Sequence, residues 1–245
     1  MNATYLRLEA LRVFRNKQNF IFSLIFPLVL FFVIVGTAGK GAPQIYGVSF
    51  ATYYMSGMIG FGALGAIIAG GARIALERDL GWNRQLRITP LTPRAYIRSK
   101  VIVAYMTAAI SIVLIYAAGI SMGVHMPVSR WLQMTGLILV ALIPFAAMGV
   151  MLGHLIKGDA MGPAMGGGMS LFALLGGSWF PIGQDAGFMH DLVRLIPSFW
   201  LVQAGRSAVP GAQPWTGEAW IVIAVWALLL AVGAVWAYRR DTQRA

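Results

Sequence analysis

Five long stretches of this chain contain no Asp, Glu, Lys, Arg or His, and this feature limits the folds open to it more than any other. They are residues 20–36, 53–72, 101–122, 131–153 and 219–237. An α-helix needs about 20 apolar residues to cross the hydrocarbon core of a bilayer. Hydrophobic residues make up 58% of the chain and charged residues only 11%, which is about half the charge of an ordinary soluble domain. The sequence therefore predicts an all-α protein that crosses a membrane several times.

We expect six membrane spans in a single transmembrane domain. The predicted spans are residues 20–36, 53–75, 101–122, 131–155, 161–180 and 219–237. Pro27 predicts a kink in the first span, because its ring removes one backbone hydrogen bond. The fifth span contains six glycines, and glycine-rich helices pack better against protein than against lipid. That span is therefore expected at the centre of the bundle or at a subunit interface.

A basic segment, residues 76–100, separates the second predicted span from the third. Counted from residue 73 to residue 100, the chain has seven of its nineteen Lys and Arg there, against two acidic residues. Pro90 and Pro93 disfavour helix at the residues before them. We therefore expect two helical pieces, over residues 76–87 and from residue 94 onward.

The distribution of cations predicts the orientation of the chain in the membrane. With six spans, fifteen Lys and Arg fall on the face that carries both termini and the basic segment, and four fall on the other face. Basic loops stay on the cytoplasmic side, so both termini are expected in the cytoplasm. A net charge of +11 could also indicate nucleic-acid binding, but these cations flank apolar stretches, where membrane topology accounts for them.

The first 19 residues have the pattern of an amphipathic helix. Wound as a helix, they place on one face Leu6, Ala10, Val13 and Phe14. The opposite face holds Glu9, Arg12 and Arg15. A short basic amphipathic helix lying in the membrane interface fits this pattern, and an unstructured basic tail is the alternative.

Two stripes of small residues recur with a period of four. The second span carries Gly62, Ala66 and Gly70, and the fifth carries Gly162, Gly166 and Ser170. Small side chains at this spacing let another helix approach closely. The first stripe predicts either the wall of a translocation path or internal helix packing.

The connection before the last span, residues 181–218, is expected outside the cytoplasm and is rich in aromatic residues. Marker residues of this region are Trp179, Phe180, Pro181, Pro197, Phe199 and Trp200. Two short amphipathic helices separated at Pro197 fit the pattern. They could re-enter the membrane where protein covers them, or form an ordinary outer loop with an aromatic belt.

The sequence contains no recognisable motif for catalysis, metal binding or nucleotide binding. The chain has no cysteine, and its three histidines, His125, His154 and His190, lie far apart in the sequence, so we predict no metal site. There is no GxxxxGK[ST] phosphate loop and no constellation of catalytic groups. Ion-coupled carriers need ionisable groups at membrane depth, and the five stretches named above contain no Asp, Glu, Lys, Arg or His. We therefore predict a transporter without catalysis or a cofactor of its own, powered from outside the membrane.

At this point the chain resembles a known family. The segment between spans two and three contains Glu77-Arg78, Gly81, Leu86-Arg87, Thr89-Pro90-Leu91, Tyr96 and Lys100, in that order. The outer connection contains Gly177-Ser178-Trp179-Phe180-Pro181 and then Leu195-Ile196-Pro197-Ser198-Phe199-Trp200. With six spans and a basic amphipathic start, the chain is similar over its whole length to permease subunits of type-2 ATP-binding-cassette exporters, especially the daunorubicin-resistance-like branch.

The resemblance implies partners and roles. Two permease subunits pair, as a homodimer or heterodimer, in a bacterial cytoplasmic membrane, and two separate ATPase subunits that carry ATP and Mg²⁺ dock beneath them. Residues 6–14 would lie at the interface, residues 77–98 would contact the ATPase, and residues 179–200 would re-enter from outside. The coupling role falls on Glu77, Arg78, Gly81, Arg84, Arg87, Pro90 and Pro93. Alternatively, Glu77 and Arg78 simply mark the membrane boundary.

The substrate is the least specified part. Thirteen Met, thirteen Phe and eight Trp suit a hydrophobic or amphipathic solute such as a drug, natural product or lipid-like molecule, because such side chains repack easily. A polysaccharide or teichoic-acid substrate is an alternative. A secondary carrier driven by an ion gradient and a non-transporting scaffold also stay open as functions.

Overall fold

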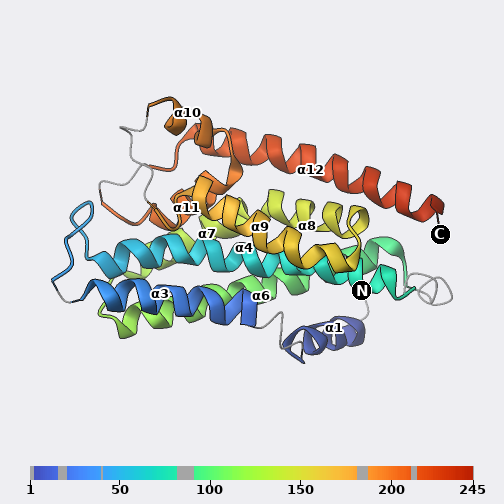
Figure 1. The fold of residues 1–245 in the computed structure, drawn as a ribbon, viewed down its shortest axis with the longest axis horizontal. Helices are drawn as coiled ribbons and strands as arrows, with labels where there is room; N and C mark the ends of the chain where they lie inside the picture. The colour runs from blue at the N-terminus through green and yellow to red at the C-terminus, as the bar shows by residue number, and fades with distance from the viewer. Residues whose placement is uncertain are drawn as a thin grey trace.

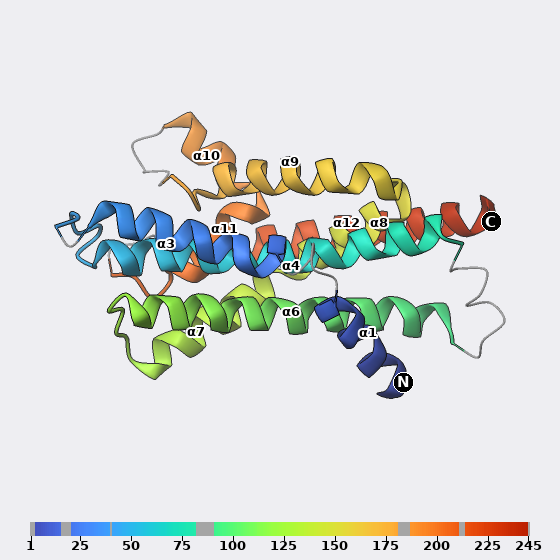
Figure 2. The ribbon, with the colours of Figure 1, turned by 60° about the horizontal axis from the view of Figure 1, so that its bottom comes forward.

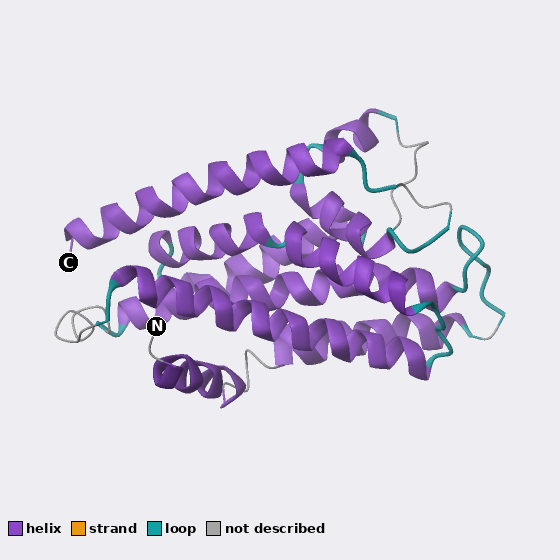
Figure 3. Ribbon diagram, turned by 180° about the vertical axis from the view of Figure 1, so that it is seen from behind, coloured by secondary structure: helices purple, strands orange, loops and turns teal. Residues whose placement is uncertain are grey.

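The structure is a computed structural model that describes residues 3–15, 21–39, 41–81, 91–180, 187–210 and 214–244. Within these ranges the chain forms helices joined by turns, and the sole strand-like pairing is an isolated bridge between Ile45 and Val48 (Figure 3). The predicted all-α class is confirmed at this level.

Four helical segments among the described residues are long and apolar enough to cross a membrane. They are Phe50–Asp79, Pro93–Ser121, Val128–Leu155 and Gly217–Asp241. A shorter apolar helix covers Ser23–Ala38. A helix of 19 residues, α9 (Gly158–Gly176), is diluted by glycine and is not among the four. The structure therefore supports a protein with several membrane spans, and the count of six stays a prediction.

The 30-residue helix α4 (Phe50–Asp79) is the central element of the bundle. Ser49 caps its start, accepting a hydrogen bond from the Thr52 amide at 3.2 Å, and most of its residues are buried. Around it pack α3 (Phe26–Ala38), α6 (Pro93–Ser121), α8 (Ile143–Leu155), α9 and α11 (Pro197–Arg206), as Figures 1 and 2 show. Helix α12 (Gly217–Arg244) lies along one side of the bundle, mainly against α8 (Figure 1).

Two proline positions coincide with irregular helix. A π-helical turn, η1 (Ile21–Ile25), directly precedes α3, in which Pro27 is the second residue. Helix α7 (Val128–Ala141) is separated from α8 by the single residue Leu142, two residues before Pro144. Proline cannot donate to the preceding turn, so the helix bends or changes its hydrogen-bond spacing there.

The basic segment forms less helix than predicted. Helix α4 ends at Asp79, Leu80 caps it, and Gly81 has a φ of +71°, a conformation that favours glycine. The predicted helical piece over residues 76–87 is therefore wrong at residues 80 and 81, because the chain turns there. Residues 82–90 lie outside the described part. Helix α6 starts at Pro93, one residue before the predicted start, and the Thr92 hydroxyl accepts from the Ala95 amide at 3.3 Å.

The outer connection contains two short helices, α10 (Phe188–Arg194) and α11, with Pro197 as the first residue of α11. Every residue of α11 is buried, and the helix packs against α4, α7, α9 and α12. The helix is thus part of the bundle interior rather than a surface loop.

Candidate functional site

The described parts of the basic segment, the first described helix and the end of the last described helix lie at one end of the bundle. Helix α1 (Ala3–Arg15), the end of α4, the start of α6 and the end of α12 all lie there (Figures 1 and 2). The turn between α8 and α9 belongs to the same end, since Arg78 and Asp79 of α4 bond to its backbone. We call this the basic end and treat it as the candidate functional site.

A buried charge cluster, defined as Glu9, Glu77, Tyr96 and Lys100, joins three helices at the basic end. The Lys100 ammonium donates to Glu9 Oε1 at 2.6 Å and to Glu77 Oε1 at 2.5 Å. The Tyr96 hydroxyl donates to Glu77 Oε2 at 2.7 Å. The side chains of Lys100 and Glu9 are 1% and 2% exposed. Their charged forms are therefore stabilised by the ion pair and not by hydration. The cluster ties α1 to α4 and α6.

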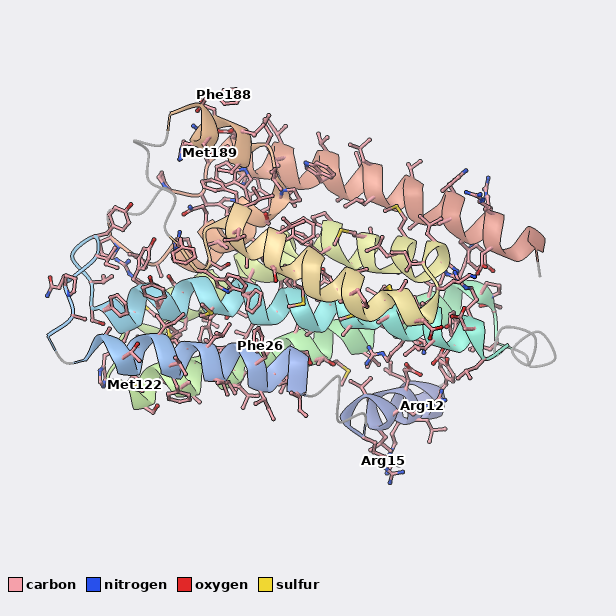
Figure 4. All side chains as sticks on the ribbon, in the orientation of Figure 1. Arg12, Arg15, Phe26, Met122, Phe188 and Met189 are labelled. Atoms are coloured by element: carbon pink, nitrogen blue, oxygen red, sulfur yellow. The ribbon has the colours of Figure 1, made fainter. Side chains whose placement is uncertain are left out.

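Helix α1 is not oriented as the sequence pattern predicted. Glu9 was expected on the polar, water-facing side, but it is buried together with Val13, one turn further on. The outward face exposes Leu8 and Leu11 beside arginines, and Arg15 points away from the bundle (Figure 4). The prediction was wrong because the helical pattern alone places every charged side chain on the water-facing side. In the structure Lys100 provides Glu9 with a buried partner of opposite charge.

Arg78 and Asp79 hold the turn between α8 and α9 from the end of α4. Arg78 donates to the carbonyl oxygens of Gly153, His154 and Ile156. Carbonyl groups at the C-terminal end of a helix have no amide donor within the helix itself. Asp79 Oδ2 accepts from the Gly158 amide at 2.5 Å, at the start of α9. A cation at a helix C-terminus and an anion at a helix N-terminus both complement the helix dipole. We call this pair the turn clamp.

The turn clamp also reaches the last helix. Asp241 of α12 lies 3.8 Å from Arg78 Nε and 3.0 Å from His154 Nδ1. His154 is stacked edge-on against Tyr238 with ring centroids 5.3 Å apart. The ends of α4, α8 and α12 are therefore joined through Arg78 and Asp241.

Replacing Arg78 by lysine is expected to lower the free energy of unfolding by about 2 kcal/mol. A lysine ammonium cannot reach three carbonyl oxygens as the planar guanidinium does. Hydrogen bonds to charged groups are worth about 1.5–3 kcal/mol each. Chemical unfolding of the purified chain in detergent measures this. Arg98→Lys is the matched control, since Arg98 is exposed on α6 and should change nothing. Equal stability of the two variants would show that the clamp is not needed.

Small residues set the spacing of the bundle, and the stripe predicted on α4 is one such contact. A side chain added at Gly62 would lie 2.5 Å from Ser111 Oγ, and one at Gly70 would lie 3.0 Å from Ala104 Cβ. Ala66 is buried between them in sequence. The stripe therefore faces α6, as the packing interpretation predicted.

The stripe predicted on α9 meets no other helix among the described residues. A Cβ added at Gly162 or Gly166 would meet nothing within 4 Å, and Ser170 bonds to the Gly166 carbonyl of its own helix. Helix α9 lies at the edge of the bundle (Figure 2). Its glycine face is therefore not at the centre of this chain.

At the opposite end, Arg206 fixes α11 in the bundle. Its guanidinium donates to the Gly177 carbonyl at 2.5 Å and lies 4.4 Å from the centre of the Tyr53 ring. The sequence had placed this cation in an outer link, but the structure leaves it 4% exposed. Helix α10 is attached to α12 by an ion pair between Arg194 and Glu218.

The aromatic residues predicted for the outer connection have different environments. Trp179 packs edge-on against Phe61, and Phe199 and Trp200 are almost fully buried. Phe180, by contrast, is 66% exposed. Pro181 lies outside the described residues.

Comparison with known proteins identifies the family. Residues 42–238 match the family described as ABC-2 family transporter protein. The chain belongs to the ABC-2 transporter family. It is also 28% identical over 225 residues to "Putative transport permease YvfS" of Bacillus subtilis (strain 168), with 91% of each chain covered. The resemblance noted from the sequence is thus confirmed for an ABC-2 type permease, and the particular branch stays a prediction.

In this ABC-2 protein, the residues predicted to contact an ATPase fall into three groups. Glu77 and Arg78 are engaged inside the chain, in the buried charge cluster and the turn clamp. Gly81 lies in the turn after α4 and Pro93 is exposed at the start of α6. The remaining three lie outside the described residues: Arg84, Arg87 and Pro90. In the structure Glu77 and Arg78 therefore have partners inside the chain. Neither the predicted contact with an ATPase nor the alternative that they mark the membrane boundary had included such partners.

Sequence reasoning missed several groups of this permease that hold the basic end together. Glu9 was assigned to the polar face of the first helix, Tyr96 and Lys100 were named only within the family motif, and Asp79 was counted only as a charge. None of the four was predicted to make the short polar contact that it has in the structure. A signal was available for one of them, because a lone acidic residue among the four cations of residues 1–19 is unusual on a helix expected to face anionic lipid. Among the described residues, no three His, Asp or Glu side chains are grouped as a metal ion would need.

Proposed function

We propose that this chain is the membrane-spanning subunit of an ATP-driven exporter, powered by a separate ATPase subunit that carries ATP and Mg²⁺. The observation that carries this proposal is membership of the ABC-2 transporter family over residues 42–238. The basic end supports it, because α1, α4, α6, α8, α9 and α12 are interconnected there through side chains. A movement that the ATPase imposes on the basic end would therefore be transmitted to several helices at once.

The ATPase docks, in this proposal, on the segment between α4 and α6. Glu77 and Arg78 act indirectly, by fixing the ends of α4, α6 and α8, whereas the cations that remain exposed on α6, Arg94 and Arg98, offer direct contacts. Arg84, Arg87 and Pro90 belong to the same proposed surface by sequence. Opposite charges on the ATPase would steer and orient docking more than they add affinity.

The arrangement in the membrane follows from the charges. We place the basic end in the cytoplasm, with both termini there, since basic segments stay inside, and we place the chain in a bacterial cytoplasmic membrane. In this proposal α3 and α9 are the two further spans, which together with the four long segments make six. Helices α10 and α11 form the re-entrant part from outside, and the open glycine face of α9 fits a second permease subunit, identical or different.

A hydrophobic or amphipathic solute, such as a drug, natural product or lipid-like molecule, is the substrate we propose for export. The core between α4, α9 and α11 consists mainly of aromatic and aliphatic side chains, although a few polar residues are buried at its outer end, namely Thr52, Ser56, Ser198, Gln203 and Arg206. Soft apolar walls suit such solutes, and a polysaccharide would need more polar side chains.

Co-purification from the native host in lipid nanodiscs tests this function. We expect an ATPase subunit to accompany the wild-type chain and to hydrolyse ATP. The double variant Arg94→Glu/Arg98→Glu should retain about tenfold less of it, because two exposed contacts worth up to about 1 kcal/mol each become repulsive. Asp191→Lys, a charge reversal at an exposed residue of α10, is the control. Absence of any ATPase with the wild type would refute the exporter, and full retention by the double variant would refute docking on α6.

A further inference from the structure

The most anomalous group in the described structure is the guanidinium of Arg73 on α4. Arg73 is 9% exposed, and its three guanidinium nitrogens have no hydrogen-bond partner. It lies one turn before Glu77, near Gly70 and against α6, where the Lys100 carbonyl and Ala104 also approach. A buried charge without a partner is strongly unfavourable, so this arginine requires an acceptor in some state of the protein.

A carboxylate oxygen of α1 at the same end of the bundle is equally without a partner. Glu9 uses Oε1 for Lys100, while its Oε2 is buried and unbonded. Arg73 lies one helical turn before Glu77, whose carboxylate shares the Lys100 ammonium with that of Glu9, so these are the two carboxylates of the same buried region. Both oxygens of Glu77 are already engaged, by Lys100 and by Tyr96. Glu9 Oε2 is therefore the acceptor that remains for Arg73.

The balance of charge favours an internal partner over a bound anion. The two buried cations, Arg73 and Lys100, face the two carboxylates of Glu9 and Glu77, so the group is neutral when all four interact. Arg12 adds a further cation at 3.6 Å from Glu77, but its side chain is 55% exposed and is screened by water. A phosphate or an acidic peptide would bring excess negative charge into a buried place that already holds two carboxylates.

We propose that the permease has a second state in which Glu9 of α1 pairs with Arg73 of α4, so that α1 moves from its seat on α6 toward α4. One displacement would satisfy both unpartnered groups. In the structure α1 packs mainly on α6, crossing it at the basic end (Figure 2). Because α4 touches five other helices of the bundle, the position of α1 and the arrangement of the bundle become linked through this ion pair.

The stability of a variant gives a first test that separates this role from a structural one. In the structure Arg73 makes no hydrogen bond, so replacing it by methionine should keep or raise the thermal midpoint of unfolding of the purified chain. A bonded structural arginine would give a clear fall in the midpoint. A midpoint well below that of the matched variant Arg98→Met would therefore overturn the proposal.

The second state itself is tested by distance measurement between spin labels on the permease alone in nanodiscs, so that the result does not depend on an ATPase. The chain has no cysteine, and Leu8→Cys on α1 and Leu80→Cys after α4 give two labels at positions that are 55% and 82% exposed. We expect Arg73→Met and Glu9→Gln each to shift the distribution to longer distances, and the double variant to shift it no further.

Arg98→Met, which removes an exposed cation from the same end, should leave the distance distribution unchanged. Arg73→Gln is the second variant if the methionine does not fold, and it should give the same shift. An unchanged distribution in the Arg73 variants would overturn the proposal. A shift with Arg73→Met that Glu9→Gln does not reproduce would also overturn it, because the pairing would then involve another group.

Discussion

Replacing Lys100 by methionine is expected to lower the free energy of unfolding by about 3–5 kcal/mol. The ammonium is 1% exposed and is the shared partner of Glu9 and Glu77. Without it, the two buried carboxylates lose the cation that they share, and removing one partner from a buried ion pair costs far more than the pair contributes. Chemical unfolding of the detergent-solubilised chain, followed by circular dichroism, measures the change.

Arg98→Met is the control for Lys100→Met, since it removes a cation from the same helix at an exposed position and should change stability by less than about 0.5 kcal/mol. The triple variant in which Glu9 and Glu77 also become glutamine should recover part of the loss, because the unpaired charges are then gone. If Lys100→Met were as stable as Arg98→Met, the buried charge cluster would not hold the three helices together.

Gly71→Ala is expected to destabilise the bundle by about 3 kcal/mol or more. A Cβ on Gly71 of α4 would overlap the Gly149 carbonyl of α8 and lie 2.5 Å from its carbonyl carbon. Backbone atoms cannot move aside as a flexible side chain can, so the two helices would separate along their length, and overpacking of this kind costs about 1–3 kcal/mol or more. Thermal unfolding in detergent tests it.

Gly136→Ala in α7 makes the same chemical change in a helix where the new methyl meets nothing within 4 Å. It should be neutral or stabilising by up to about 1 kcal/mol, because alanine favours helix over glycine. The pair of variants therefore separates the effect of backbone contact from the effect of glycine on helix formation. Similar midpoints for Gly71→Ala and Gly136→Ala would contradict the close approach of α4 and α8.

Local sequence patterns were enough for much of the architecture. Long uncharged stretches predicted an all-helical membrane protein, because a backbone in hydrocarbon must satisfy its own hydrogen bonds. Pro90 and Pro93 predicted the start of α6 to within one residue, and the run around Glu77 and Gly81 supported the family. These features depend on residues close together in the chain, so a single sequence expresses them.

The sequence alone therefore determined the helical, membrane-spanning class, the family and the concentration of cations at one end. The tertiary structure alone decided which charges are buried and which glycines touch backbone. Glu9 was assigned to water because its partner, Lys100, is 91 residues away. Likewise nothing near Gly71 in sequence indicates Gly149. Whether a charge or a glycine is essential depends on what the fold brings against it, and that is a property of non-local contacts.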